Sequence, residues 1–218
     1  MSAPTVLPAS PTPADAAALA RALLRIGAVR LRPDEPFTWA SGRQAPVYTD
    51  TRRTLGHPGL RARLAEGFAH AAAPFAPEVI AGTATAGIPH AAWLAARLGL
   101  PMAYVRGAAK GHGLRNQIEG ASVEGCRVVL VEDLVSTGGS VLEAAEALRA
   151  AGAEVVAALA VFTYALPGTA ARFAAYGLPL VTLTSFPDLL AAAEADGALA
   201  PAALGTLRAW HADWGAEG

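Results

Sequence analysis

Two adjacent carboxylates, Glu132 and Asp133, stand between an apolar run and a loop of small residues. Burying an ionised carboxylate costs several kcal/mol unless it is paired or hydrogen-bonded, so this acid pair does not fit an ordinary core position. Carboxylate oxygens accept hydrogen bonds from the hydroxyl groups of a sugar, and they bind divalent cations. The acid pair therefore indicates a site for one of these ligands, although by itself it also fits two solvated acids after a strand.

The loop that follows, Ser136-Thr137-Gly138-Gly139-Ser140, has the composition of a phosphate cradle. Its glycines allow the backbone to approach a ligand closely, and its hydroxyl groups can donate to phosphate oxygens. A helix that begins at such a loop adds its free N–H groups. The chain has no Gly-Lys-Ser or Gly-Lys-Thr sequence, so the lysine of a P-loop nucleotide triphosphatase is missing. We call residues 136–140 the phosphate loop.

Regular elements must hold these groups in place. Val128-Val129-Leu130-Val131 is typical of a short buried strand, and residues 141–148 repeat apolar side chains at helical spacing. The same order of strand, small-residue loop and helix occurs earlier, in residues 79–82, 83–87 and 88–98. We expect both loops at the carboxyl edge of one sheet, where open α/β sheets bind their ligands.

Strand and helix patterns alternate along most of the chain, which predicts an α/β fold with a doubly wound, mostly parallel sheet flanked by helices. The expected strands are residues 28–32, 79–82, 101–105, 128–131, 154–164 and 178–183, and residues 37–50 hold two more, joined by a turn at Ser41-Gly42. The expected helices are residues 14–26, 57–73, 88–98, 141–151, 167–176, 187–195 and 201–214. Residues 106–120 are polar and glycine-rich, and we expect a mobile loop there.

The composition limits the class of protein. A length of 218 residues with 53% hydrophobic residues suffices for one well-buried core, and a formal net charge of −1 offers little to a polyanion such as nucleic acid. The single cysteine, Cys126, excludes an internal disulfide and a cysteine-based metal site. Neither a membrane-spanning run nor a signal peptide is present. We therefore expect a cytoplasmic protein with no nucleic-acid and no membrane partner.

One domain is expected after a short leader. Residues 1–13 are predicted to be a disordered leader, and residues 14–218 a single domain without repeats or linkers. Within this domain we distinguish a small N-terminal lobe, the hood, at about residues 14–55, a core at about residues 56–185, and C-terminal helices at about residues 186–214.

The stretch Val129-Leu130-Val131-Glu132-Asp133-Leu134-Val135-Ser136-Thr137-Gly138-Gly139-Ser140 resembles the phosphoribosyl pyrophosphate (PRPP) signature of the type I phosphoribosyltransferases. The resemblance implies that the acid pair contacts the ribose hydroxyls and that the phosphate loop binds the ribose 5-phosphate. Residues 83–87 resemble the pyrophosphate loop of the same family. The PRPP-binding residues implied by the two stretches are Thr83, Ala84, Thr85, Glu132, Asp133, Leu134, Val135, Ser136, Thr137, Gly138, Gly139 and Ser140.

Two further stretches narrow the resemblance to the orotate phosphoribosyltransferases. Residues 37–48 are similar to the hood segment of these enzymes. Tyr104-Val105-Arg106, Lys110-Gly111-His112-Gly113 and Asn116-Gln117-Ile118-Glu119-Gly120 are similar to their catalytic loop. The resemblance covers about residues 23–183, and it implies a homodimer in which the catalytic loop, residues 106–120, reaches the site of the neighbouring subunit.

The implied reaction joins orotate to the ribose of PRPP and gives orotidine 5'-monophosphate and pyrophosphate, in de novo pyrimidine biosynthesis. Mg²⁺ is the implied cofactor, held mainly by PRPP without a direct protein ligand. Cations that arrive with the closing loop would stabilise the charge that develops on the leaving pyrophosphate. These cations are Lys110 and His112, with Arg106 at the loop base, and the implied catalytic residues are Lys110, His112, Glu132 and Asp133. The implied contacts of orotate are Tyr48, Thr49 and Ser136.

The chain has fewer cations at these positions than some members of the family. It has Ala40, Ala86, Gly107 and Ala108 where those members have basic residues, and Tyr164 where some have an arginine for the orotate carboxylate. The residues that could replace this arginine are Arg43, Arg52 and Arg115, among which the sequence does not choose.

Two other functions stay open at this point. A phosphoribosyltransferase for a purine or for uracil would share the PRPP signature, but the hood segment and the Lys-Gly-His-Gly sequence favour orotate. A transcriptional regulator that only binds PRPP would need a DNA-binding module, and the residues before the first predicted helix are too few to form one.

Overall fold

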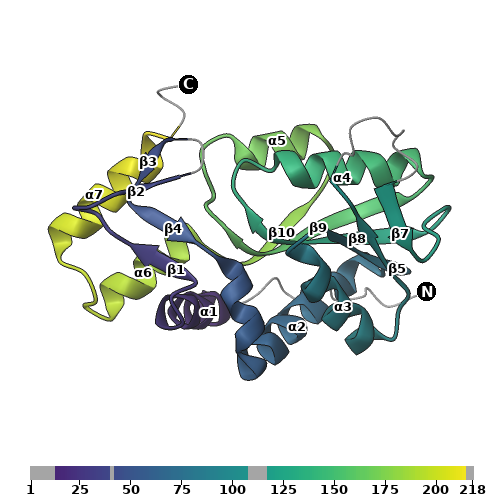
Figure 1. Ribbon diagram of the computed structural model, residues 1–218, viewed down its shortest axis with the longest axis horizontal. Helices are drawn as coiled ribbons and strands as arrows, with labels where there is room; N and C mark the ends of the chain where they lie inside the picture. The colour runs from purple at the N-terminus through teal and green to yellow at the C-terminus, as the bar shows by residue number, and fades with distance from the viewer. Residues whose placement is uncertain (1–12, 40–41, 108–116, 215–218) are drawn as a thin grey trace, which may run out of the picture.

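The computed structural model of the protein describes residues 13–39, 42–107 and 117–214. A six-stranded sheet forms its centre, with the strand order β10-β9-β8-β5-β6-β7 (Figure 1). Its strands are β5 (Val79–Thr83), β6 (Met102–Val105), β7 (Ile118–Gly120), β8 (Arg127–Val135), β9 (Glu154–Thr163) and β10 (Leu180–Ser185). All neighbouring strands in this sheet are parallel except β6 and β7. The predicted α/β class and mostly parallel sheet are confirmed.

Helices cover both faces of the sheet, as the doubly wound architecture requires. α2 (Pro58–Ala72) and α3 (Gly87–Leu98) lie on one face, and α4 (Gly139–Ala150) and α5 (Thr169–Ala175) lie on the other (Figure 1). Each was predicted within two residues at either end. α2 and α4 carry basic side chains in their last turns, which complements the helix dipole.

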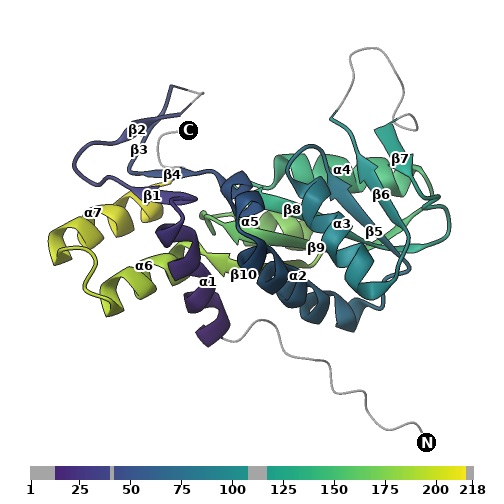
Figure 2. The same ribbon diagram turned by 60° about the horizontal axis from the view of Figure 1, so that its bottom comes forward.

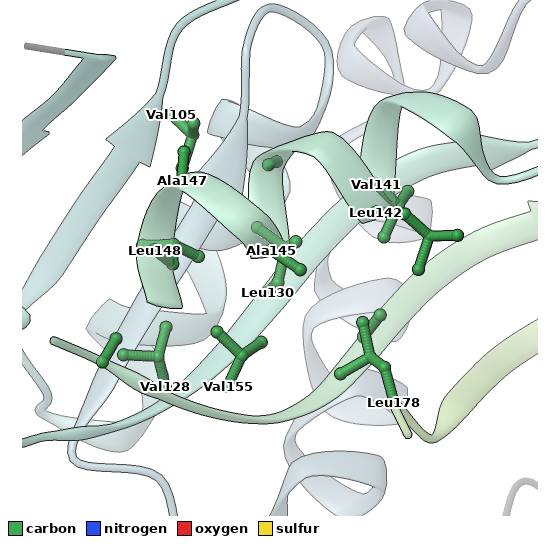
Figure 3. Packing of buried hydrophobic residues seen from close by; sticks show 14 of the residues in the cluster. Val105, Val128, Leu130, Val141, Leu142, Ala145, Ala147, Leu148, Val155 and Leu178 are labelled. Atoms are coloured by element: carbon green, nitrogen blue, oxygen red, sulfur yellow. The ribbon is translucent and has the colours of Figure 1, made fainter. Parts of the chain in front are cut away.

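The core is divided between the two faces by the alternation of side chains along β8. Val128 and Leu130 pack with Leu148 and other buried residues of α4 (Figure 3). Val129 and Val131 point the other way and belong to the cluster that includes the buried residues of α2 and α3. Because both faces of β8 are covered, its apolar run is continuous rather than alternating.

β8 is longer than the strand predicted from this apolar run. It continues to Val135, because Glu132 and Leu134 still pair with residues of β9, whose ten residues offer partners beyond the apolar stretch. The acid pair therefore lies within the strand, and our placement of it after the strand end was wrong. Side-chain polarity misled the prediction, since strand pairing is made by backbone groups that every residue carries.

The predicted loop at residues 106–120 also needs a correction at its far end. Residues 118–120 form β7, which pairs antiparallel with β6, with Ile118 opposite Val105. Gly120 has a φ of 103°, and a Cβ at this position would lie 2.6 Å from Met102 O, so only glycine allows this strand to approach β6 so closely. Residues 108–116 of the predicted loop lie outside the described residues.

The N-terminal region contains the helix α1 (Pro13–Arg25) and two small sheets. The helix begins at a proline, as predicted. β1 (Val29–Leu31) pairs antiparallel with β4 (Val47–Thr49), and β2 (Phe37–Thr38) pairs antiparallel with β3 (Gln44–Ala45). We expected two strands in residues 37–50, and the structure has three, because β4 pairs with β1 and not within the hairpin. The 3₁₀ helix η1 (Thr51–Gly56) then leads to α2. Ser41 of the predicted turn lies outside the described residues, and Gly42 lies within them.

The N-terminal region and the C-terminal helices pack together beside one edge of the sheet. α6 (Phe186–Ala195) and α7 (Pro201–Ala212) lie next to the strands of the N-terminal region (Figures 1 and 2). Leu23 of α1, Val47 of β4 and Leu207 of α7 share one buried cluster. Nothing in the sequence predicted this association. In the described ranges, no helix combines the length and the apolar character needed to cross a membrane.

Candidate active site

Glu132 is buried, and its surroundings change its protonation. Its side chain is 7% exposed, and the backbone N–H of Asp133 donates to its Oε1 atom at 2.9 Å. Burial raises the pKa of Glu132 to about 8, and the hydrogen bond to the Asp133 side chain and the charge of Asp133 add to the rise. Asp133 is half-buried and accepts a hydrogen bond from Thr51 Oγ1 of η1. At neutral pH the protonated form of Glu132 is therefore favoured in the absence of a ligand.

A glycine brings the pyrophosphate loop against the acid pair. A Cβ atom on Gly87, the first residue of α3, would lie 2.4 Å from Val131 O, 2.5 Å from Thr83 Oγ1 and 3.3 Å from the Cα atom of Glu132. No other residue allows this approach without a shift of the backbone. Gly82 shows the same crowding one step earlier, since its Cβ would lie 2.9 Å from Ile88 Cα. The two glycines therefore hold the start of α3 directly on β5 and β8.

The pyrophosphate loop itself is tied to strands on both sides. Thr83 Oγ1 donates to Val131 O of β8 at 3.3 Å, and the backbone N–H of Ala84 donates to Val105 O of β6 at 2.8 Å. The peptide bond between Ala84 and Thr85 is cis, and both residues are exposed. The structure thus brings Thr83 next to the acid pair, and Ala84 and Thr85 follow it in the same loop.

The phosphate loop turns from β8 into α4. Gly138 precedes the helix with a φ of 85°, in the left-handed region that glycine adopts without strain. Thr137 and Ser140 are exposed, and Ser136 is half-buried. The free N–H groups of the first turn of α4 add a partial positive charge at the same place. Hydroxyl groups, backbone amides and a helix start therefore coincide, as predicted.

A cavity of about 260 Å³ connects three of the predicted segments. Its lining includes Thr83 and Ala84 of the pyrophosphate loop, Arg106 and Gly107 at the base of the catalytic loop, and Ser140 of the phosphate loop. The position of Arg106 is fixed by β7, because its Nε atom pairs with Glu119 at 3.1 Å and its backbone N–H donates to Gln117 O. Lys110 and His112 lie outside the described residues, so the structure does not test their predicted roles.

The predicted base pocket is built from aromatic and hydroxyl groups. Tyr48 is half-buried beside the ring of Phe37 at 5.6 Å, and the guanidinium of Arg30 lies 4.8 Å from its ring centre. The Thr49 Oγ1 atom is buried, and the side chain of Tyr164 lies within hydrogen-bonding reach of Thr49. Tyr164 is 3% exposed, and burial raises its pKa to about 12. These residues thus offer hydroxyl groups and a neutral phenol, but Tyr164 supplies no positive charge.

Arg52 is the described candidate whose charge interacts with the acid pair. Its Nε atom donates to Asp50 Oδ1 at 2.9 Å, and this bond and the Asp50 charge raise the pKa of Arg52, with a smaller rise from Asp133. Arg43 is placed over the ring of Trp214, with its guanidinium carbon 3.9 Å from the ring centre. Arg115 lies outside the described residues.

Two buried polar residues near the site were missed by the sequence analysis. Thr51 is 1% exposed and holds Asp133, but nothing in its sequence context indicates this role. His90 is 1% exposed between Phe68 and Trp93, and neither of its ring nitrogens has a partner among the described residues. Burial lowers the pKa of His90 to about 4, so the ring is neutral at pH 7.

The oxygen atoms of the acid pair also fit a divalent cation that is shared with a ligand. Carboxylates are the protein ligands that Mg²⁺ prefers, usually one or two of them together with phosphate oxygens of the substrate. Within residues 13–39, 42–107 and 117–214, no three His, Cys, Asp or Glu side chains gather as a complete metal site. The donor set therefore suits a cation that arrives with its substrate better than one held by protein alone.

Known proteins share these features. Residues 60–175, which include the acid pair and both small-residue loops, match the family model of the phosphoribosyl transferase domain. The chain is 51% identical to an orotate phosphoribosyltransferase of Bacillus pumilus, over 91% of this chain and 95% of that protein. The crystal structure of orotate phosphoribosyltransferase from Aeropyrum pernix matches with a TM-score of 0.72 and 35% identity, over 84% of this chain and 99% of that one. The Mycobacterium tuberculosis enzyme in complex with PRPP matches with a TM-score of 0.65 and 30% identity, over 80% and 98%.

Proposed function

The chain belongs to the phosphoribosyl transferase family and, within it, to the orotate phosphoribosyltransferases, and from that premise we propose how its residues carry out the reaction. The enzyme transfers the phosphoribosyl group of PRPP to orotate and releases pyrophosphate, which gives orotidine 5'-monophosphate in pyrimidine biosynthesis. Enzymes of this family use PRPP and generally a divalent metal ion. The observation that carries this function is the 51% identity over 91% of the chain to a relative with that activity in its name.

The direct experiment measures the consumption of orotate by its ultraviolet absorbance, with purified protein, PRPP and Mg²⁺. Orotate should disappear at a rate proportional to the enzyme concentration. Adenine, hypoxanthine and uracil serve as competing bases in parallel reactions. Turnover of one of these bases without turnover of orotate would contradict the substrate and leave the fold assignment intact.

In the proposed mechanism the protein stabilises charge and supplies no nucleophile, because a ring nitrogen of orotate loses its proton to water and attacks C1 of the ribose. The bond from C1 to the pyrophosphate oxygen breaks, and its electron pair leaves with pyrophosphate. Glu132 and Asp133 accept hydrogen bonds from the ribose hydroxyls and stabilise the positive charge of the ribosyl oxocarbenium ion. Lys110 and His112 donate to the leaving pyrophosphate, so they bind the transition state more tightly than the ground state.

We propose Mg²⁺ as the divalent ion. When bound, it would neutralise part of the charge on pyrophosphate, so the protein donors would have less charge to stabilise. Glu132 and Asp133 would hold it indirectly, because they would bind the ribose of the PRPP that carries it.

We assign the orotate carboxylate to Arg52. Its Nε atom is used by Asp50, which leaves the two terminal nitrogens for a planar, bidentate contact. Arg52→Leu should raise the KM for orotate about 10- to 100-fold with little change in the KM for PRPP, as expected for the loss of a charge-assisted contact. Arg53→Leu is the matched control, because this exposed neighbour lies on the same 3₁₀ helix. Equal effects of the two substitutions would remove Arg52 from this role.

We further propose a homodimer in which the catalytic loop, residues 106–120, completes the site of the neighbouring subunit. The resemblance of the loop to that of the family supports this arrangement, and so does the position of the loop base beside the pyrophosphate loop. A cytoplasmic location remains a prediction from the sequence, as do the leader at residues 1–13 and the division into hood, core and C-terminal helices.

A further inference from the structure

α5 is a short helix that lies beside α4 on one face of the sheet (Figure 1). It is only seven residues long, and none of the segments that resemble the family's site includes it. Three of its residues, Thr169, Arg172 and Phe173, are spaced i, i+3 and i+4, so they share one face of the helix. This face contacts the phosphate loop.

Successive residues of the phosphate loop each contact one residue of α5. Thr169 Oγ1 donates to Ser136 O at 3.2 Å, and Arg172 Nη1 donates to Thr137 O at 3.4 Å. Thr169 is 5% exposed, so water competes little with its hydroxyl group for the carbonyl oxygen of Ser136. Three successive residues of the loop thus have their partners on α5, because the ring of Phe173 lies next to Gly138.

Phe173 fixes how far the loop stands from the helix. A Cβ atom on Gly138 would lie 2.3 Å from Cε2 of Phe173 and 2.9 Å from Cζ. The ring is 2% exposed and is therefore held in place by the core around it. Gly138 rests on this ring with a φ of 85°, so the loop cannot move closer to α5.

α5 is also fastened to α4 at its other end. The guanidinium of Arg149 donates to Tyr176 O at 3.3 Å and to Gly177 O at 3.4 Å, and it lies 4.5 Å from the centre of the Tyr176 ring. The Tyr176 hydroxyl donates to Glu146 Oε2 at 2.6 Å. The phosphate loop, α4 and α5 therefore form a closed bracket, in which the loop is held from two sides.

The two carbonyl contacts determine the direction of the loop amides. In a trans peptide unit, the C=O of one residue and the N–H of the next point in opposite directions. Because the carbonyls of Ser136 and Thr137 point at α5, the N–H groups of Thr137 and Gly138 point away from it. Neither N–H has a protein acceptor among the described residues. Free amides that converge at a helix start are the donors that a phosphate group needs.

We propose that the face of α5 formed by Thr169, Arg172 and Phe173 is a template that turns the amides of the phosphate loop toward the ribose 5-phosphate. The three residues are positioning residues, since they act on the ligand through the loop. The inference rests on the proposed function of the phosphate loop, and it adds the reason why this loop is in its binding conformation before the ligand arrives.

The test compares two probes that use different loops: ribose 5-phosphate, which needs the phosphate loop, and pyrophosphate, which needs residues 83–87. Thr169→Val should weaken the binding of ribose 5-phosphate about tenfold in isothermal titration calorimetry, the size expected when a loop carbonyl loses its donor. Pyrophosphate should bind as it does to the wild type. In turnover, the KM for PRPP should rise more than the KM for orotate, because only one of the three proposed orotate contacts, Ser136, belongs to the phosphate loop.

Three further variants show whether a loss is specific. Thr169→Ser keeps the hydroxyl and should restore the affinity for ribose 5-phosphate. Arg172→Met, at an exposed position that tolerates substitution, should weaken ribose 5-phosphate as well. Thr184→Val is the matched control, because Thr184 is also buried and donates to a backbone carbonyl, Ala16 O at 2.9 Å, outside the bracket. It should lower the melting temperature without changing either affinity.

The outcomes separate this inference from the proposed function. Wild-type affinity for ribose 5-phosphate in both Thr169→Val and Arg172→Met would overturn the template, while the wild-type enzyme would still bind PRPP. An equal loss of both probes in Thr169→Val would also overturn it, since the effect would then be a general loosening. A wild-type protein that binds no ribose 5-phosphate would overturn the proposed function and the template together.

Discussion

Burial favours the protonated form of Glu132, and the protonation state determines how many hydrogen bonds its side chain can accept from the ribose hydroxyl groups. A carboxylate accepts hydrogen bonds from two hydroxyl groups, whereas a protonated carboxyl group uses one oxygen as a donor. Since the pKa of Glu132 is raised to about 8, chiefly by burial, the ligand-free protein holds this residue mainly protonated at pH 7. Binding of the ribose diol should therefore drive a proton off Glu132.

The first prediction concerns the affinity for PRPP as a function of pH. The affinity should rise between about pH 6 and about pH 9, because the ionised form that accepts the ribose hydroxyls becomes more abundant. Calorimetry in buffers of different ionisation enthalpy should show proton release at pH 7. Glu132→Gln should bind PRPP more weakly and without proton release. An affinity that does not change over this range, in the wild type, would contradict the role of Glu132.

The same raised pKa predicts the pH dependence of stability without ligand. The folded state binds this proton more tightly than the unfolded state, whose carboxyl group has a pKa near 4.5. The contribution of Glu132 is therefore complete below about pH 4.5 and is lost as pH rises through about 8. Melting curves of the wild type and of Glu132→Gln should diverge over this window, with the wild type losing more stability as pH rises. Parallel curves would show that Glu132 is not perturbed.

At the scale of elements, the approach of α3 to β8 depends on the missing side chain of Gly87. A methyl group there would overlap Val131 O at 2.4 Å and Thr83 Oγ1 at 2.5 Å. Both atoms belong to strands in the middle of the sheet, so α3 has to move and takes the pyrophosphate loop with it. The packing of α3 and the position of the pyrophosphate loop therefore both require glycine at position 87.

Gly87→Ala should therefore lower the free energy of unfolding by about 1–3 kcal/mol, the range for overpacking, and raise the KM for PRPP about tenfold. Gly59→Ala is the control, because no atom lies within 4 Å of its Cβ position in the first turn of α2. This change should be neutral or stabilise by about 0.5–1 kcal/mol, since alanine favours a helix. Urea unfolding and initial rates measure both quantities. Equal stability of the two variants would contradict the close packing at Gly87.

At the scale of the whole molecule, the C-terminal helices support the N-terminal strands that carry Tyr48 and Thr49, the proposed contacts of orotate in the base pocket. The indole of Trp39 donates to Val47 O at 3.0 Å, next to Tyr48, and its ring lies 5.6 Å from that of Tyr164. Trp210 and Trp214, at the end of the described chain, contact the Trp39 ring as well. The last helix is therefore linked to the base pocket through one layer of aromatic side chains.

Removing a core side chain from this last helix should affect both stability and orotate binding. Leu207→Ala should cost about 2–5 kcal/mol of unfolding free energy, because Leu207 is fully buried. The KM for orotate should rise more than the KM for PRPP, whose loops lie in another part of the sheet. Thr206→Ala, at the exposed neighbouring position, is the control. Equal changes in the two KM values would show that the aromatic layer does not support the base pocket.

The proposed dimer makes a quantitative prediction for mixed subunits. Lys110→Ala and Asp133→Asn should each lower turnover about 100-fold or more as homodimers. A heterodimer, isolated through two different tags, should regain about half of the wild-type activity, since one of its two sites has an intact acid pair and receives an intact loop. A heterodimer as inactive as its parents would place the loop in its own subunit. Failure of the two tags to purify together would exclude the dimer.

The sequence by itself determined the bounds of several local elements and predicted the chemistry of the site. Apolar spacing, prolines and glycines act over a few residues, so the bounds of α1, α3 and β5 were predicted within two residues. The order of apolar run, acid pair and phosphate loop indicated a ligand with phosphate and hydroxyl groups without any knowledge of the fold. Residue types and their spacing carry this information directly.

Only the tertiary structure decided which groups meet. Glu132 is buried because β9 continues beside it, Asp133 is held by Thr51 from 82 residues away, and the loop amides are turned by α5. The packing of α7 against the N-terminal strands likewise joins the two ends of the chain. Each of these contacts links segments whose local sequences fit many partners equally well. Their pairing follows from the packing of the whole core, which leaves one arrangement for each segment.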